Sequence, residues 1–136
     1  MSVQFHAAFS NNAAQTFVGL LAENPTWDVA RDAFQMVIRY PDGIEYDDGA
    51  YVLAAAALIT SKQVGAPALP PPYLGLVATL GEVPAAIQRL AVQAFPIAIV
   101  EQKKLAERWL EPGDRAKWGA AMDELQEALA RLEAGL

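Results

Sequence analysis

The sequence predicts an all-α fold, a single irregular bundle of about six to seven helices over residues 1–136. Alanine accounts for 27 of the 136 residues, and Leu, Glu, Gln and Arg, which also favour helix, supply many of the others. No segment alternates apolar and polar residues for long enough to indicate a strand. The chain has no cysteine and is 54% apolar, so it is expected to bury one core without disulfides or metals.

The first two helices are expected on either side of an Asn-Pro break. The first should begin after Ser10 or Asn11, whose side chains suit an N-cap, and end near Glu23. Thr26 is expected to cap the second helix, which should end near Tyr40. Its apolar residues recur at helical spacing and predict one broad buried face: Val29, Ala30, Ala33, Phe34, Val37 and Ile38.

The third helix is expected to be the central one. A Pro-Asp-Gly turn at 41–43 precedes it, and Asp47 or Asp48 is expected to cap its start. Gly65 suits its C-terminal end. The stretch from Ala50 to Ile59 carries no charge, and a helix that is apolar on every side is typical of a core.

The second half is expected to follow a proline-rich connection. Residues 63–81 are uncharged, but four prolines interrupt them, so the sequence predicts a linker and not a membrane span. A short helix is expected over Tyr73–Leu80, and a long helix from Pro84 to about Leu110 with a kink at Pro96. Pro112 should start the last helix, whose seam is Trp118, Met122, Leu125, Leu129 and Leu132.

Several segments carry a family resemblance that covers almost the whole chain. They are the run Phe9–Ala14 followed by Phe17, the helix Ala50–Gly65, and the block Leu105–Trp109 followed by Trp118 and Leu125. In this order they resemble a bacterial family of small helical proteins of unknown function, whose members begin with Trp-Gly and then Phe-x-Asn-Asp-x-Ala. Gln4-Phe5-His6 stands in the place of Trp-Gly, which marks a divergent member. The resemblance implies a helical fold and brings no activity with it.

Composition and charge exclude several functions. The net charge of −6 and the pI near 4.6 argue against a nucleic-acid partner, because phosphates require clustered Lys and Arg. The first thirty residues hold no Lys or Arg, so no secretory signal and a cytoplasmic location are expected. His6 is the single histidine and no Gly-x-Ser-x-Gly motif is present. We therefore expect no catalytic residues, no cofactor and no membrane association.

The negative charge is concentrated in the first half. Residues 1–60 hold two basic and seven acidic side chains, a net charge of −5. The carboxylates at 42–48 do not follow the order of a helix-loop-helix calcium site, so no metal site is expected. Such a cluster creates a local field that attracts a basic protein. The predicted partner-binding residues are Asp42, Glu45, Asp47 and Asp48, together with Asp28 and Asp32.

These features predict a non-enzymatic binding protein, most concretely an immunity-type inhibitor that masks a basic toxin or effector domain. Two alternatives stay open. One is a hydrolase whose carboxylates come together from different helices. The other is a structural, self-associating helical module, and the chain is accordingly expected to be a monomer or a homodimer.

Overall fold

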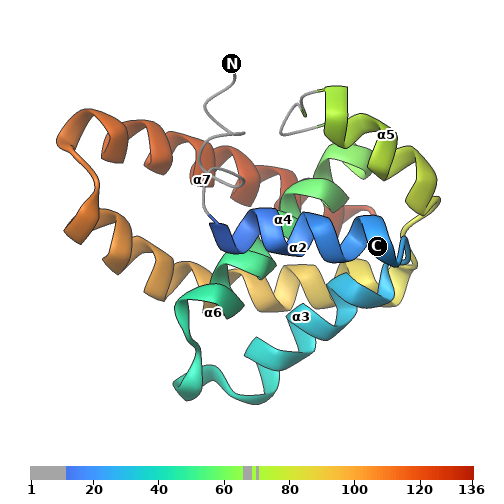
Figure 1. Ribbon diagram of the computed structural model, residues 1–136, viewed down its shortest axis with the longest axis horizontal. Helices are drawn as coiled ribbons and strands as arrows, with labels where there is room; N and C mark the ends of the chain where they lie inside the picture. The colour runs from blue at the N-terminus through green and yellow to red at the C-terminus, as the bar shows by residue number, and fades with distance from the viewer. Residues whose placement is uncertain (1–11, 66–68, 70) are drawn as a thin grey trace.

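The computed structural model describes residues 12–65, 69 and 71–136, and every regular element in these ranges is helical (Figure 1). The all-α prediction is therefore confirmed. A 3-10 turn, η1, accompanies six α-helices; in chain order the elements are α2 (Asn12–Glu23), α3 (Asp28–Arg39), η1 (Pro41–Gly43), α4 (Tyr46–Val64), α5 (Pro71–Leu80), α6 (Ala85–Trp109) and α7 (Pro112–Ala134).

Helix α4 is the centre of the bundle, as its uncharged run predicts. It packs against α2, α3, α6 and α7, and residues 52–60 are all buried. Four consecutive alanines, 54–57, are fully buried, and their small side chains let the surrounding helices approach closely. Thr60 is the buried polar residue of this helix, and its hydroxyl donates to the carbonyl of Ala56 at 2.8 Å. All six helices contribute to one cluster of buried apolar residues.

The ends of the first two described helices differ slightly from expectation. Helix α2 ends at Glu23 as predicted, whereas Ser10 and Asn11, the expected caps, lie outside the described residues. Helix α3 begins at Asp28 with Trp27 in the N-cap position. Thr26 still serves the helix start, because its hydroxyl oxygen accepts the N–H of Asp28 at 3.3 Å. The predicted apolar face is confirmed: Ala30, Phe34 and Val37 are buried, and Val29, Ala33 and Ile38 pack against the core.

The start of α4 corrects the predicted cap. The helix begins at Tyr46, with Glu45 as N-cap and Asp48 as the third helical residue. Glu45 and Asp48 form a capping box, in which each side chain accepts the backbone N–H of the other residue. Neither Asp47 nor Asp48 is thus the N-cap. Glu45 takes that position because its carboxylate accepts a free backbone N–H of the first helical turn, that of Asp48. The C-terminal prediction is confirmed, since Gly65 adopts a left-handed conformation with φ of 75°.

The second half follows the predicted order. Helix α5 begins at Pro71, two residues earlier than expected, because proline suits the first turn of a helix. Pro84 is the N-cap of α6 and not a first-turn residue, and α6 continues through Pro96 to Trp109; the kink at Pro96 stays a prediction. The seam of α7 is confirmed, with Trp118 half-buried against the core and four buried residues, Met122, Leu125, Leu129 and Leu132.

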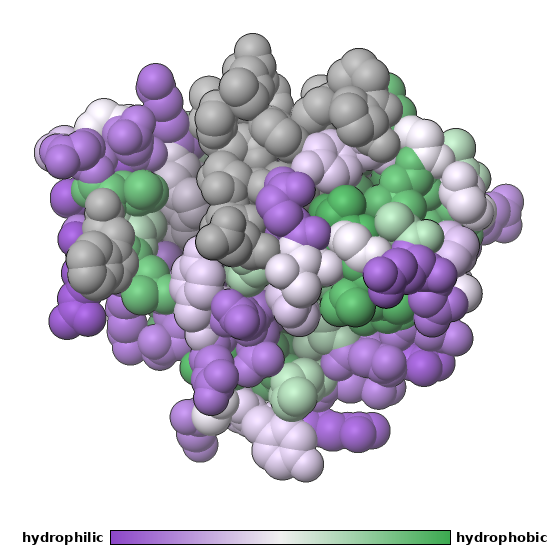
Figure 2. All heavy atoms as spheres, in the orientation of Figure 1, coloured by the Kyte–Doolittle hydropathy of each residue, from purple (hydrophilic) through white to green (hydrophobic). Residues whose placement is uncertain are grey.

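Exposed apolar side chains gather over α2 and α5 on one face of the molecule. Figure 2 shows green side chains gathered over the region of α2 and α5, with polar side chains around them. Leu20 on α2 and Leu74 on α5 are exposed large apolar residues. Trp27 links the loop before α3 to the loop after α5, because its indole N–H donates to the carbonyl of Gly81 at 3.2 Å. No helix among the described residues is long and apolar enough to cross a membrane.

Candidate functional site

Four of the six predicted partner-binding carboxylates lie close together in sequence, two in the connection from α3 to α4 and two in the first turn of α4. We call residues 40–48 the acidic loop. Its middle is anchored by Ile44, a half-buried residue that packs against the core. Pro41 opens the 3-10 turn on one side of this anchor, and Glu45 caps α4 on the other. The loop is therefore a short surface segment with one residue, Ile44, packed against the core and with its last residues in the start of α4.

The carboxylates of the acidic loop have different roles. Asp48 accepts the N–H of Glu45 at 3.1 Å, and the Glu45 carboxylate accepts the backbone N–H of Asp48 in return. Asp42 and Asp47 are exposed, and neither has a hydrogen bond or ion pair to any residue that the structure describes. Two carboxylates thus stabilise the start of the helix, while two are free to meet a partner.

Two tyrosines lie beside the free carboxylates. Tyr40 and Tyr46 are exposed, with 63% and 43% of the residue surface accessible. Burial, and to a lesser extent the neighbouring charge of Asp47, raises the pKa of Tyr46 above its usual value. Sequence reasoning identified the acids of this loop but not its aromatic character, although both tyrosines are visible in the sequence next to aspartates.

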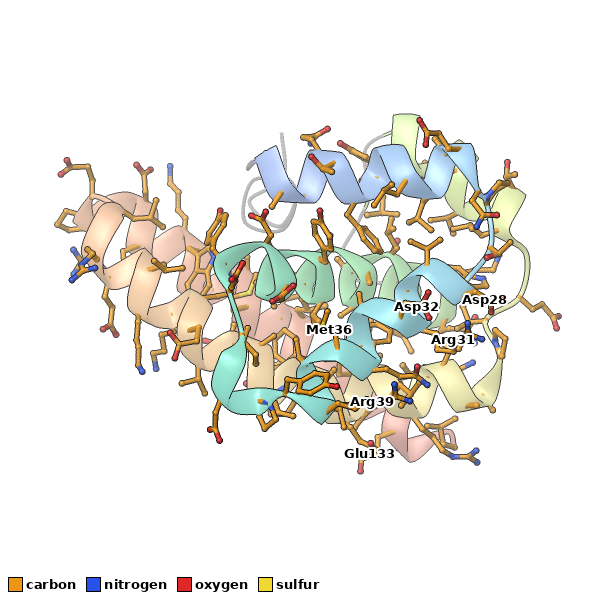
Figure 3. The ribbon with its side chains drawn as sticks, turned by 60° about the horizontal axis from the view of Figure 1, so that its bottom comes forward. Asp28, Arg31, Asp32, Met36, Arg39 and Glu133 are labelled. Atoms are coloured by element: carbon orange, nitrogen blue, oxygen red, sulfur yellow. The ribbon has the colours of Figure 1, made fainter. Side chains whose placement is uncertain are left out.

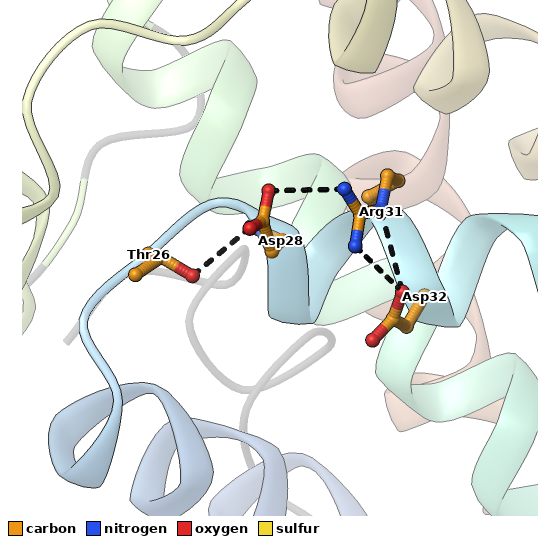
Figure 4. A network of polar contacts seen from close by, with 4 residues as sticks. All are labelled: Thr26, Asp28, Arg31 and Asp32. Atoms are coloured by element: carbon orange, nitrogen blue, oxygen red, sulfur yellow. Dashed lines mark hydrogen bonds and ion pairs between the residues drawn. The ribbon is translucent and has the colours of Figure 1, made fainter.

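Asp28 and Asp32 form a separate group with Arg31 (Figure 4). Arg31 is bonded to Asp28 at 3.2 Å and to Asp32 at 3.3 Å; the two aspartate side chains are exposed and that of Arg31 is half-buried. Figure 3 shows this group at the start of α3 and Arg39 at the opposite end of the helix. The two ends lie about 16 Å apart along the axis, given the rise per residue of an α-helix. The fold therefore divides the six predicted carboxylates into two groups.

The acidic loop is tied to α6 by a glutamine that the sequence did not reveal. Gln102 is buried, and its side-chain amide donates to the carbonyl of Tyr46 at 3.1 Å. The same side chain lies against Gly49, where a Cβ atom would be 2.8 Å from Nε2 of Gln102. The sequence around Gln102 does not indicate this contact, because its partner Tyr46 lies far away in the chain.

A pocket opens between the end of α6 and the start of α7. Its volume is about 390 Å³, and its apolar lining comes from Ala106, Pro112, Ala116 and Trp118. Lys103, Arg115 and Glu107 supply the charged part of the wall. The sequence analysis expected Trp118 to belong to the core seam. The structure places it both against the core and in the pocket wall.

A metal site needs several ligands close together in the described part of the chain. No group of three or more His, Cys, Asp or Glu side chains there could hold a metal ion. The pocket wall contains one carboxylate, that of Glu107, whereas the carboxylate mechanism of glycoside hydrolysis uses two. His6 lies outside the described residues.

Comparison with known proteins gives a family and no function. No curated protein and no solved structure matches the chain. One family model matches residues 6–121, which is most of the 136-residue sequence. The chain therefore belongs to the family described as Domain of unknown function (DUF4259).

Proposed function

We propose that the protein is a non-catalytic cytoplasmic binding module, an immunity-type inhibitor that holds a basic toxin or effector domain at its acidic loop. One observation carries the proposal: Tyr40 and Tyr46 are exposed beside two carboxylates, Asp42 and Asp47, that have no partner among the described residues. Tyrosines are frequent energetic anchors of protein interfaces. Unpaired carboxylates attract a basic surface from a distance and orient it.

The bonds at the α4 end of the acidic loop support this role. The capping box at Glu45 and Asp48 and the bond from Gln102 to Tyr46 fix this end of the loop in the unbound chain. A preformed surface loses less conformational entropy on binding than a mobile one. Asp28 and Asp32 have a weaker part in this proposal, because Arg31 pairs with both and offsets one of their two charges.

The experiment starts from basic proteins encoded beside the gene for this chain. Each is co-expressed with the chain in a growth assay, and association with the purified chain is followed by stopped-flow fluorescence. For a cognate partner, Asp42→Lys with Asp47→Lys should lower the association rate about tenfold or more at low salt. Tyr40→Ala should mainly raise the dissociation rate, because the lost contact forms only in the docked complex.

The matched control reverses the same number of charges at the other acidic group. Asp28→Lys with Asp32→Lys changes the net charge equally but should lower the association rate much less. Equal effects of the two double variants would show that only total charge matters and would contradict a site at the acidic loop. If no neighbouring product binds the chain or is neutralised by it, the inhibitor role is wrong.

A further inference from the structure

The pocket between α6 and α7 has the chemistry of a docking site. Its lining is largely apolar and also includes two cations, Lys103 and Arg115, and one carboxylate, Glu107. Neither cation has an ion pair with any residue that the structure describes. Arg115 is held in place by a hydrogen bond from Nη2 to the carbonyl of Leu110 at 3.2 Å, which leaves other N–H groups of its guanidinium free to donate. The pocket therefore suits an apolar or aromatic side chain next to a carboxylate.

The acidic loop offers this combination on the same chain. It presents exposed tyrosine rings with carboxylates one or two residues away, at Tyr40 and Asp42 and at Tyr46 and Asp47. The pocket volume of about 390 Å³ lies in the range of protein pockets that enclose small molecules, and a phenol ring fits within it. Lys and Arg beside an aromatic face add a cation–π attraction.

The two surfaces are neighbours in the fold. Gln102 bonds to Tyr46 in the acidic loop, and the next residue along α6, Lys103, lines the pocket. Figure 1 likewise shows the first turn of α4 beside the C-terminal half of α6. An isologous interface uses the same surface on both copies, so a site and its complement must both lie within that surface for a two-fold rotation to bring each onto the other.

We propose that two copies of this chain form a two-fold symmetric dimer, in which the acidic loop of each copy enters the α6–α7 pocket of the other. The carboxylates at 42 and 47 then meet the cations at 103 and 115, and a tyrosine ring packs against the apolar side chains of the pocket. Each pairing occurs twice because of the symmetry. The dimer uses the same loop as the proposed inhibitor function but does not depend on that function, and it can be tested with the purified chain alone.

Charge reversal on each side gives a decisive test. By analytical ultracentrifugation at about 100 μM, a range in which modest dimer affinities are populated, the unaltered chain should have twice the monomer mass of 14.6 kDa. Asp47→Lys and Lys103→Glu should each raise the dimer dissociation constant about tenfold or more, because like charges then face each other. An equimolar mixture of the two variants should recover the doubled mass, because both contacts of the heterodimer are again between opposite charges.

Two control variants separate this interface from general charge effects. Asp123→Lys on α7 and Arg89→Glu on α6 change exposed residues by the same charges and should leave the dissociation constant unchanged. Asp47→Lys also reduces the net charge of −6, so a loss of dimer occurs although the overall repulsion falls. Circular dichroism verifies that each variant is folded.

Three results would overturn the dimer. They are a monomeric unaltered chain at every concentration, a dimer insensitive to both charge reversals, and a mixture of the variants that stays monomeric. The second would place self-association elsewhere, for example on the apolar surface of α2 and α5. A monomer that still binds a basic partner through the acidic loop would refute the dimer and leave the proposed function intact.

Discussion

The side-chain amide of Gln102 donates to the backbone carbonyl of Tyr46 at 3.1 Å, and so joins α6 to the first turn of α4 beside Gly49. This contact explains why a glycine is found in a helix that is otherwise rich in alanine. A methyl group at position 49 would lie 2.8 Å from Nε2 of Gln102. The buried glutamine would have to move, and its bond to Tyr46 would be lost.

Gly49→Ala should therefore destabilise the protein. The lost hydrogen bond costs about 1 to 3 kcal/mol, and the better helix propensity of alanine returns about 1 kcal/mol, so the free energy of unfolding should fall by about 1 kcal/mol. Urea denaturation measures the change. As controls, Gly19→Ala and Gly75→Ala, in helices with no atom within 4 Å of the added methyl, should stabilise by about 0.5 to 1 kcal/mol. Stabilisation by Gly49→Ala would contradict the close approach.

Trp27→Phe should remove the hydrogen bond that links the loop before α3 to the loop after α5. The indole N–H of the buried Trp27 donates to Gly81 at 3.2 Å, and phenylalanine would keep most of the apolar contact but leave that carbonyl without its donor. We expect the free energy of unfolding to fall by about 1 to 3 kcal/mol in thermal or urea denaturation. The half-buried Trp118 makes no hydrogen bond to a residue that the structure describes, so Trp118→Phe should cost less. A larger loss of unfolding free energy in Trp118→Phe than in Trp27→Phe would contradict a stabilising role for the bond from Trp27 to Gly81.

Adjacent aspartates in the first turn of α4 should respond differently to alanine. Asp48→Ala removes the acceptor of the Glu45 N–H and should lower the free energy of unfolding by about 1 kcal/mol. Asp47→Ala removes only a favourable charge near the helix N-terminus and should cost about 0.3 to 0.5 kcal/mol. The two values can be compared in one urea series at low salt. Equal losses of unfolding free energy in the two variants would show that the capping box stabilises the helix start no more than the charge of Asp47 does.

High pH should weaken the fold partly through Tyr46. Burial and the charge of Asp47 raise the pKa of Tyr46 in the folded chain, so the folded state holds this proton more tightly than the unfolded state. The resulting stability is complete below the unfolded pKa of about 10 and is lost as the pH rises through the folded pKa. Tyr46→Phe should therefore show a smaller loss of stability at high pH than the unaltered chain.

A second variant separates the two causes of the shift. Asp47→Asn removes the charge and leaves the burial, so tyrosinate absorbance should give a pKa for Tyr46 that moves part of the way back to the ordinary value. The variant Tyr46→Phe identifies the tyrosine in the absorbance titration. An unchanged titration in Asp47→Asn would show that the neighbouring carboxylate has no influence.

The sequence predicts the helices well because their signals are local. The apolar face of α3, the uncharged run of α4 and the seam of α7 each follow from spacing alone, and Gly65 ends α4 as expected. Helix starts are less predictable. Glu45 caps α4 because its carboxylate and that of Asp48 act reciprocally, and sequence offers several acids within reach of the same N–H groups.

The candidate site is only partly predictable from sequence, because a local pattern does not show which distant residues meet in the fold. The acids at 42–48 are close in sequence and stay close in the fold, whereas Asp28 and Asp32 are separated from them by the length of α3. The bond from Gln102 to Tyr46 joins residues more than fifty positions apart, and no local pattern encodes such a pairing. The pocket residues lie within 103–119, but they form a pocket only because α6 and α7 fold back on each other. Arg31 offsets its neighbouring aspartates, so counting charges overstates the acidity of α3.

The burial of α4 also has a consequence for synthesis on the ribosome. Residues 52–60 are buried by partners that include α6 and α7, and these helices are translated only afterwards. Roughly 70 further residues must emerge before Leu132 completes the covering seam, which takes about 4 to 14 s at ordinary elongation rates. During this interval a long apolar helix has no permanent cover. The nascent chain should therefore bind chaperones most strongly while α4 is outside the ribosomal exit tunnel and α7 is still inside.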